Sequence, residues 1–113
     1  AKVIQEQLSC IAGQLPVILT GDFNAPADPK IDGPYRVLAV EHAWVDSYRA
    51  IFPDVAEEGT FNSFKGEKTG PRIDWILTTP PAKTLSANII RQGKDGRFPS
   101  DHFPVTAVIV PCP

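Results

Sequence analysis

The sequence predicts a layered α/β fold, and three observations support this prediction. An amphipathic stretch over residues 1–14 is followed closely by an apolar strand at 16–20, an order typical of α/β layers. Residues 72–79, RIDWILTT, alternate in the way that strands do. Twelve prolines in 113 residues favour loops of fixed geometry over long helices. This length fits one domain or part of one.

The first expected element is the end of an amphipathic helix within residues 1–14. Gly13 fits its C-terminal stop. Apolar side chains recur at helical spacing at Val3, Ile4, Leu8 and Ile11.

The later elements are expected to be short and separated by loops. Their order is a helix at 35–41, a strand turning into a helix within 44–52, and strands at 60–64, 72–79, 84–92 and 105–110. The main loops are expected at 25–34, 53–59 and 93–104.

Composition excludes some classes of protein. Eleven basic and thirteen acidic residues give a net charge of −2, too balanced for tight nucleic-acid binding driven by charge, although nucleic acid remains open as a substrate. No apolar stretch is long enough to span a bilayer. Cys10 and Cys112 are expected to be free thiols.

Three segments place polar residues at or inside predicted strands: GDFN at 21–24, RID at 72–74 and SDH at 100–102. Each has an ordinary structural explanation. Asp22 and Asn24 could form a turn at a strand end, and Asp74 could face solvent. Asp101 and His102 could be loop residues without a catalytic role.

Together the segments suggest a catalytic site. A partly buried Asp74 needs a partner, and His102 would supply one while fixing its own tautomer. Asp22 and Asp101 would offer the hard oxygen ligands that Mg²⁺ takes, with Mn²⁺ as an alternative. Asn24 would donate to a developing oxyanion. This set suits attack of water on a phosphate ester.

In this order, GDFN, RIDWIL and SDHFPV resemble the C-terminal half of the endonuclease/exonuclease/phosphatase superfamily, whose members include exonuclease III-like and DNase I-like nucleases. The resemblance extends from about Ile11 to Val110. It implies that residues 1–113 form part of one domain, the C-terminal half of a four-layered α/β sandwich. That half would hold one mostly antiparallel sheet with flanking helices.

The resemblance also implies roles for individual residues. Asp22 would orient or activate the attacking water, and Asn24 would contact the scissile phosphate. His102 would contact the phosphate or act as the base, with Asp74 orienting it. Asp101, with Asp22, would hold the metal.

Three further residues are not assigned to catalysis. Arg72 would bind the substrate phosphate or pair with a nearby carboxylate. Asp46 is expected to be structural, and His42 is expected to lie at the surface or to cap a helix.

The superfamily domain is about twice as long as this chain, and its first half supplies further metal ligands and phosphate contacts. We therefore expect an isolated fragment to be inactive or weakly active. Its substrate would be nucleic acid, a phospholipid head group or a sugar phosphate. The alternative is a non-catalytic half-domain that acts in binding or assembly, and an exposed sheet face would then favour self-association.

Overall fold

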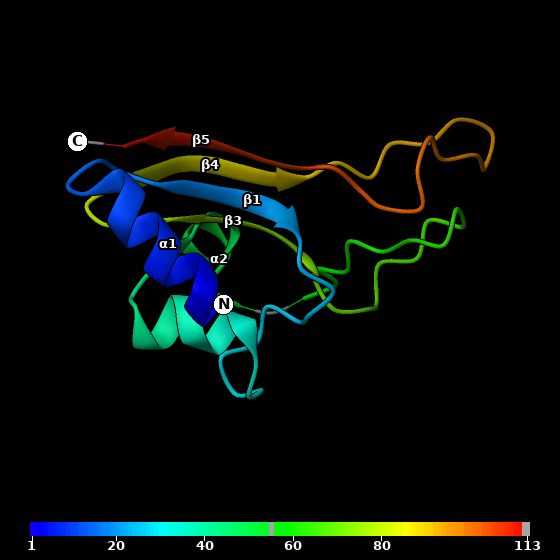
Figure 1. Ribbon diagram of the computed structural model, residues 1–113. Helices are drawn as coiled ribbons and strands as arrows, with labels where there is room; N and C mark the ends of the chain where they lie inside the picture. The colour runs from blue at the N-terminus through cyan, green and yellow to red at the C-terminus, as the bar shows by residue number, and fades with distance from the viewer. Residues whose placement is uncertain (55, 112–113) are drawn as a thin grey trace.

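The structure is a computed structural model that describes residues 1–54 and 56–111 (Figure 1). The helices of this part are α1 (Lys2–Ala12), the π-helix η1 (Arg36–Glu41) and α2 (Ser47–Ile51). The strands are β1 (Ile18–Asp22), β2 (Val45–Asp46), β3 (Asp74–Thr78), β4 (Lys83–Ile89) and β5 (Val105–Val110). Every expected helix and strand forms except the strand at 60–64.

Strand β3 is the centre of the fold. It lies between β1 and β2 in an antiparallel sheet, and β4 and β5 form a second antiparallel pair. The predicted α/β class, with antiparallel strands and flanking helices, is confirmed. The strands form two hydrogen-bonded groups where one sheet was expected, because no backbone ladder joins β4 or β5 to β3 within the described residues.

The core lies against β3. Trp75 and Leu77 of this strand are buried, together with Leu38 from η1. Phe23, just after β1, stacks on Trp75 with ring centroids 4.3 Å apart, and Tyr35 meets the same indole edge-on at 5.1 Å. These aromatic contacts fix the chain on both sides of the GDFN turn.

Helix α1 buries less of its surface than the sequence predicts. The side of the helix that meets the core runs through positions 1, 5, 8 and 12, and only Leu8 there is a large apolar residue. Val3, Ile4 and Ile11 are exposed. The predicted apolar stripe is therefore wrong in detail, because these three side chains fall outside the side that packs.

Residues 60–64 form a turn, so the strand predicted there is wrong. Phe61 makes one antiparallel bridge with His102. Ser63 and Phe64 then adopt positive φ angles of 55° and 59°, a conformation that reverses the chain. The carbonyl oxygen of the Asn62 side chain accepts from the amide of Phe64 at 2.8 Å, which stabilises the reversal.

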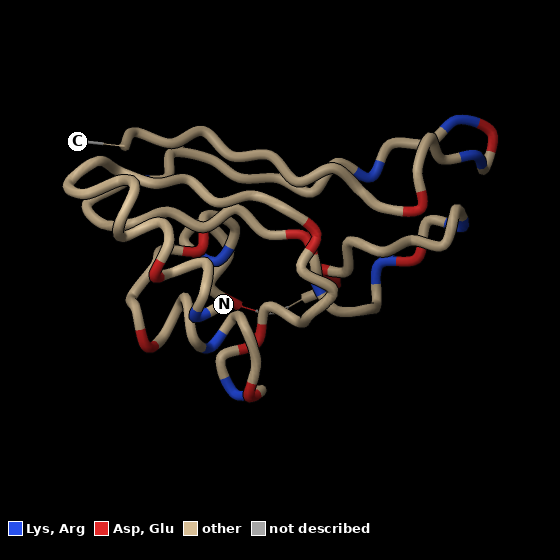
Figure 2. Tube along the Cα trace, viewed as in Figure 1, with Lys and Arg blue, Asp and Glu red and all other residues tan. Residues whose placement is uncertain are grey.

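Two loops project beyond the strand ends, one around residues 61–70 and one around 91–100 (Figure 1). Phe98 joins them. A Cβ atom built on Gly66 would lie 2.6 Å from the Phe98 ring, and one built on Gly93 would lie 2.7 Å from it. Both loops contain basic and acidic residues (Figure 2), so neither loop carries charge of a single sign.

The remaining expectations concern the surface. Ile18, Leu85 and Val108 are exposed on three strands, and self-association through such a face stays a prediction. Cys10 is a free, exposed thiol, whereas Cys112 lies outside the described residues. None of the helices in the described part has the length and hydrophobicity to cross a bilayer.

Candidate active site

Pairing of β1 with β3 brings two carboxylates together. The end of β1 and the start of β3 lie at the same edge of the sheet, and Asp22 stands directly opposite Asp74 in the register. Neighbouring carboxylates repel one another unless a proton or cation lies close to both. This sheet edge therefore favours a positive charge.

His102, in the loop before β5, supplies a group that can carry this charge. Its Nδ1 lies 2.8 Å from Oδ2 of Asp74, and its Nε2 lies 3.9 Å from Oδ2 of Asp22. An ionised carboxylate only accepts hydrogen bonds, so Nδ1 carries a proton. The bond to Asp74 raises the pKa of His102 above its ordinary value; burial opposes this rise, and the charges of Asp74, Asp22 and Asp101 add to it.

These side chains are open to a ligand. The exposed fraction of the side chain is 40% for Asp22, 20% for Asp74 and 26% for His102. All three residues line a hollow of about 450 Å³. The predicted convergence of GDFN, RID and SDH is thus observed. Their catalytic roles stay predictions.

Asn24 follows β1 in a tight turn. Its backbone amide donates to Oδ1 of Asp22 at 2.9 Å, and its φ of 47° lies in the left-handed region that Asn tolerates. The turn explanation is therefore correct for the backbone. The exposed Asn24 side chain remains available to a substrate.

Asp101 lies next to the site but outside the Asp22–Asp74–His102 group. Its carboxylate accepts from the Ser100 hydroxyl at 3.4 Å, and the same hydroxyl oxygen accepts from the amide of His102 at 3.1 Å. Asp101 contributes its charge to the raised pKa of His102. Its predicted role as a metal ligand stays a prediction.

The exposed carboxylate at this sheet edge fits a divalent cation. One ligand atom from each of Asp22, Asp74 and His102 lies within 4.8 Å of the others. Mg²⁺ usually binds one or two carboxylates and completes its shell with water and substrate phosphate. Asp22 is the better-placed oxygen donor, since it is the more exposed carboxylate and Asp74 is engaged by His102.

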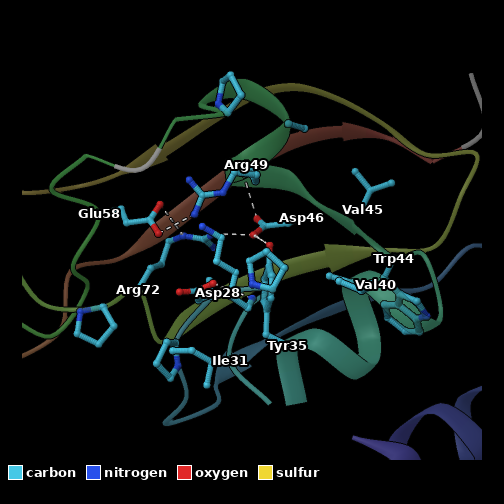
Figure 3. A pocket seen from close by; sticks show the side chains of 18 of the residues that line it. Asp28, Ile31, Tyr35, Val40, Trp44, Val45, Asp46, Arg49, Glu58 and Arg72 are labelled. Carbon is cyan, nitrogen blue, oxygen red and sulfur yellow. Dashed lines mark hydrogen bonds and ion pairs between the residues drawn. The ribbon is translucent and has the colours of Figure 1, made fainter. Parts of the chain in front are cut away.

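Arg72 lies in a second, buried cluster (Figure 3). It is fully buried and donates from Nη2 to Oδ2 of Asp46 at 2.5 Å, and its Nε lies 3.7 Å from Glu58. Arg49 donates to the same Glu58 at 2.7 Å. The substrate-binding role of Arg72 is therefore corrected to an ion pair, because its guanidinium has no exposed surface to meet a phosphate.

Asp46 organises this cluster, which confirms its predicted structural role. It caps α2 by accepting from the amides of Tyr48 and Arg49, and it also accepts from the Tyr35 hydroxyl at 2.6 Å. Burial first, and then the charge and hydrogen bond of Asp46, raise the pKa of Tyr35. The cluster borders a pocket of about 890 Å³, larger than the hollow at His102. His42 is exposed at the end of η1, as predicted.

Two residues at the site escaped the sequence prediction. Thr60 and Asn62 are fully buried and bond to the segments that carry Asp74 and Asp101. Both residues belong to the segment TFNSF at 60–64, which we interpreted as strand alternation.

Solved structures of other proteins share this fold. A mannosyl-6-phosphatase from Bacteroides thetaiotaomicron VPI-5482 is 28% identical with a TM-score of 0.75, over 96% of this chain and 43% of that one. An endonuclease/exonuclease/phosphatase family protein from Bacteroides thetaiotaomicron is 28% identical with a TM-score of 0.72, over 92% of this chain and 41% of that one. No family model and no curated protein sequence matches this chain.

The fold and the site define an antiparallel α/β half-domain with an acidic and histidine cluster at a sheet edge. This half-domain has the phosphoesterase fold of the endonuclease/exonuclease/phosphatase superfamily, and the predicted resemblance is confirmed. The chain spans less than half the length of either solved structure.

Proposed function

We propose that the full-length protein is a metal-dependent phosphoesterase that hydrolyses a phosphodiester or phosphomonoester with water. The observation that supports this most is the arrangement of His102 between two carboxylates in an open hollow. Of the two solved structures with this fold, one is named as a mannosyl-6-phosphatase and the other as an endonuclease/exonuclease/phosphatase family protein. An isolated chain of this length would be inactive or weak.

Each polar side chain has a part in the proposed reaction. Water attacks phosphorus, a P–O bond forms, and the P–O bond to the leaving group breaks, with the leaving oxygen taking a proton from solvent water. Asp22, exposed beside His102, orients this water and accepts its proton. Protonated His102 donates from Nε2 to a phosphate oxygen, and Asp74 holds the ring and stabilises its charge. Asn24 donates to the same phosphate.

A divalent cation, Mg²⁺ or Mn²⁺, would be held by Asp22 and Asp101. When bound, it supplies positive charge to the phosphate oxygens. The hard oxygen donors at this sheet edge suit a cation. The raised pKa of His102 favours its protonated form, which suits an anionic phosphate.

The proposed substrate is a phosphate ester. One neighbour is named for a mannosyl phosphate, which makes a sugar phosphate the first to test. Nucleic acid and phospholipid head groups follow, since a net charge of −2 selects against neither. p-Nitrophenyl phosphate and bis-p-nitrophenyl phosphate distinguish monoester from diester hydrolysis with one leaving group.

The test is hydrolysis by the full-length protein. Asp22→Ala and His102→Ala should each lower kcat by about 100-fold or more, the usual range for a general acid or base. EDTA should abolish the activity and Mg²⁺ restore it. Asp54→Ala and His42→Ala alter exposed residues of the same types and should leave the rate unchanged. Full activity in both site variants would rule the proposal out.

A second candidate is a non-catalytic half-domain that binds or assembles. The exposed Ile18, Leu85 and Val108 on three strands are the observation that favours it, because a contiguous apolar patch would indicate a protein partner. Light scattering of the 113-residue chain distinguishes the two candidates. A stable dimer that binds no Mg²⁺ supports assembly, whereas a monomer without metal binding argues against it.

A further inference from the structure

We infer that Thr60 is a positioning residue, which holds Asp74 and His102 in the geometry that the reaction needs. The inference rests on the proposed function and adds a residue to it. Thr60 is fully buried and lies between the two chain segments that carry this pair. It touches neither substrate nor metal in the proposed site.

The Thr60 side chain binds the start of β3. Its hydroxyl oxygen accepts from the amide of Ile73 at 3.0 Å and from the amide of Asp74 at 3.2 Å. Strand β2 cannot supply these acceptors, because it pairs only with Leu77 and Thr78 at the far end of β3. The hydroxyl therefore stands in for a missing strand beside Asp74.

The Thr60 backbone binds the loop of His102. Its carbonyl oxygen accepts from the amide of Phe103 at 2.7 Å. On either side of this bond, Phe61 bridges His102 and the amide of Asn62 donates to the carbonyl oxygen of Asp101 at 2.6 Å. The loop is thereby aligned to the same short segment as Asp74.

One residue thus connects both members of the 2.8 Å hydrogen bond. Asn62 also binds the loop side, through Asp101 and the carbonyl oxygen of Ser100, but its other hydrogen bonds stay within its own turn and none reaches Ile73 or Asp74 among the described residues. If the Thr60 hydroxyl is removed, two partly buried amides lose their acceptor, and β3 shifts relative to His102. A shift of this kind lowers kcat, which depends on alignment, more than it changes KM.

The experiment compares Thr60→Val with Thr60→Ser in the full-length protein. Valine keeps the shape and removes the hydroxyl, and serine keeps the hydroxyl. Thr78→Val is the matched control, because Thr78 is also fully buried in β3 and its hydroxyl has no hydrogen-bond partner among the described residues. We expect Thr60→Val to lower kcat by about 10- to 100-fold, as loss of an orienting partner does, with KM nearly constant. Thr60→Ser and Thr78→Val should stay close to wild type.

A second measurement does not depend on activity. Ring ¹⁵N shifts report which nitrogen of His102 carries the proton, and exposed His42 is the internal reference. In metal-free protein, Thr60→Val should move His102 away from the Nδ1-protonated form, and Thr60→Ser should not. If Thr60→Val does not fold, Thr60→Cys, whose thiol is a weaker acceptor, takes its place in the same comparison.

The outcomes are distinguishable. Unchanged ring shifts in Thr60→Val, with kcat equal to that of Thr78→Val, overturn the inference. A wild-type protein without phosphoesterase activity overturns the proposed function, and the ring shifts alone then decide whether Thr60 positions the pair.

Discussion

Two acid–base clusters lie at either side of the start of β3, and they differ in what surrounds them. Asp46 and Arg72 are 2.5 Å apart with side chains 4% and 0% exposed. Asp74 and His102 are 2.8 Å apart but 20% and 26% exposed. In the buried cluster, Tyr35 and two backbone amides occupy the remaining oxygen valences of Asp46. In the exposed cluster, Nε2 of His102 and the carboxylate of Asp22 still face the hollow.

The difference shows that similar ionic pairs can have different roles: one stabilises the fold, and the other can bind a ligand. A buried charge needs an opposite charge and hydrogen bonds close by, and Arg72 and Asp46 supply these to each other, so this cluster stabilises the fold. A half-exposed pair can keep unused donors and acceptors, so its cluster can meet a ligand. Proximity in sequence does not decide which is which, since Arg72 and Asp74 are two residues apart.

The largest expected effect tests the structural cluster. Arg72→Met leaves Asp46 buried without its cation, while Glu58 keeps Arg49, and removal of one partner of a buried ion pair destabilises a protein by about 3–5 kcal/mol. Urea unfolding followed by fluorescence measures this loss. Arg97→Ala in the exposed loop is the control and should change stability by less than about 0.5 kcal/mol. Equal stability of the two variants would contradict the structural role of Arg72.

A smaller effect is expected at Tyr35. Tyr35→Phe removes one hydrogen bond to the Asp46 carboxylate while Arg72 and the backbone amides stay in place. Hydrogen bonds to charged groups contribute about 1.5–3 kcal/mol, so the free energy of unfolding should fall by that amount. The same denaturation experiment applies, with Tyr48→Phe as a comparison at a neighbouring buried tyrosine. An unchanged midpoint would mean that Asp46 is held without Tyr35.

The smallest effect concerns protonation in the exposed cluster. Because the hydrogen bond to Asp74 raises the pKa of His102, Asp74→Asn should lower that pKa toward the ordinary histidine value. The stability that His102 gains from a raised pKa is complete below the unfolded pKa and is lost as pH rises through the folded one. NMR titration of the metal-free protein measures the pKa of His102 in wild type and in Asp74→Asn. A pKa of His102 that stays unchanged in Asp74→Asn would contradict the geometry.

Most of the candidate site could be predicted because its residues are local signals. An aspartate inside the apolar strand at Asp74 and the polar tip at Asp22 both depart from the pattern around them, and antiparallel register places them opposite one another. Strand positions were also predicted from local apolar patterns, and β5 forms at 105–110 as predicted.

The remaining features depend on contacts between distant residues. Arg72 could not be assigned from sequence because its partners lie 26 and 14 positions away. Thr60 escaped because one hydroxyl that accepts from two backbone amides leaves no periodic signal. Helix α1 has the expected period, but the periodicity of apolar residues cannot say how much of each side the sheet covers.

Phe98 has a practical consequence for engineering this protein. Its ring fills the space that a side chain at Gly66 or Gly93 would need. A loop transplanted from another protein would therefore collide with the Phe98 ring if it placed a side chain at position 66. The two loops are best grafted together, so that Phe98 and the glycines that make room for its ring are kept.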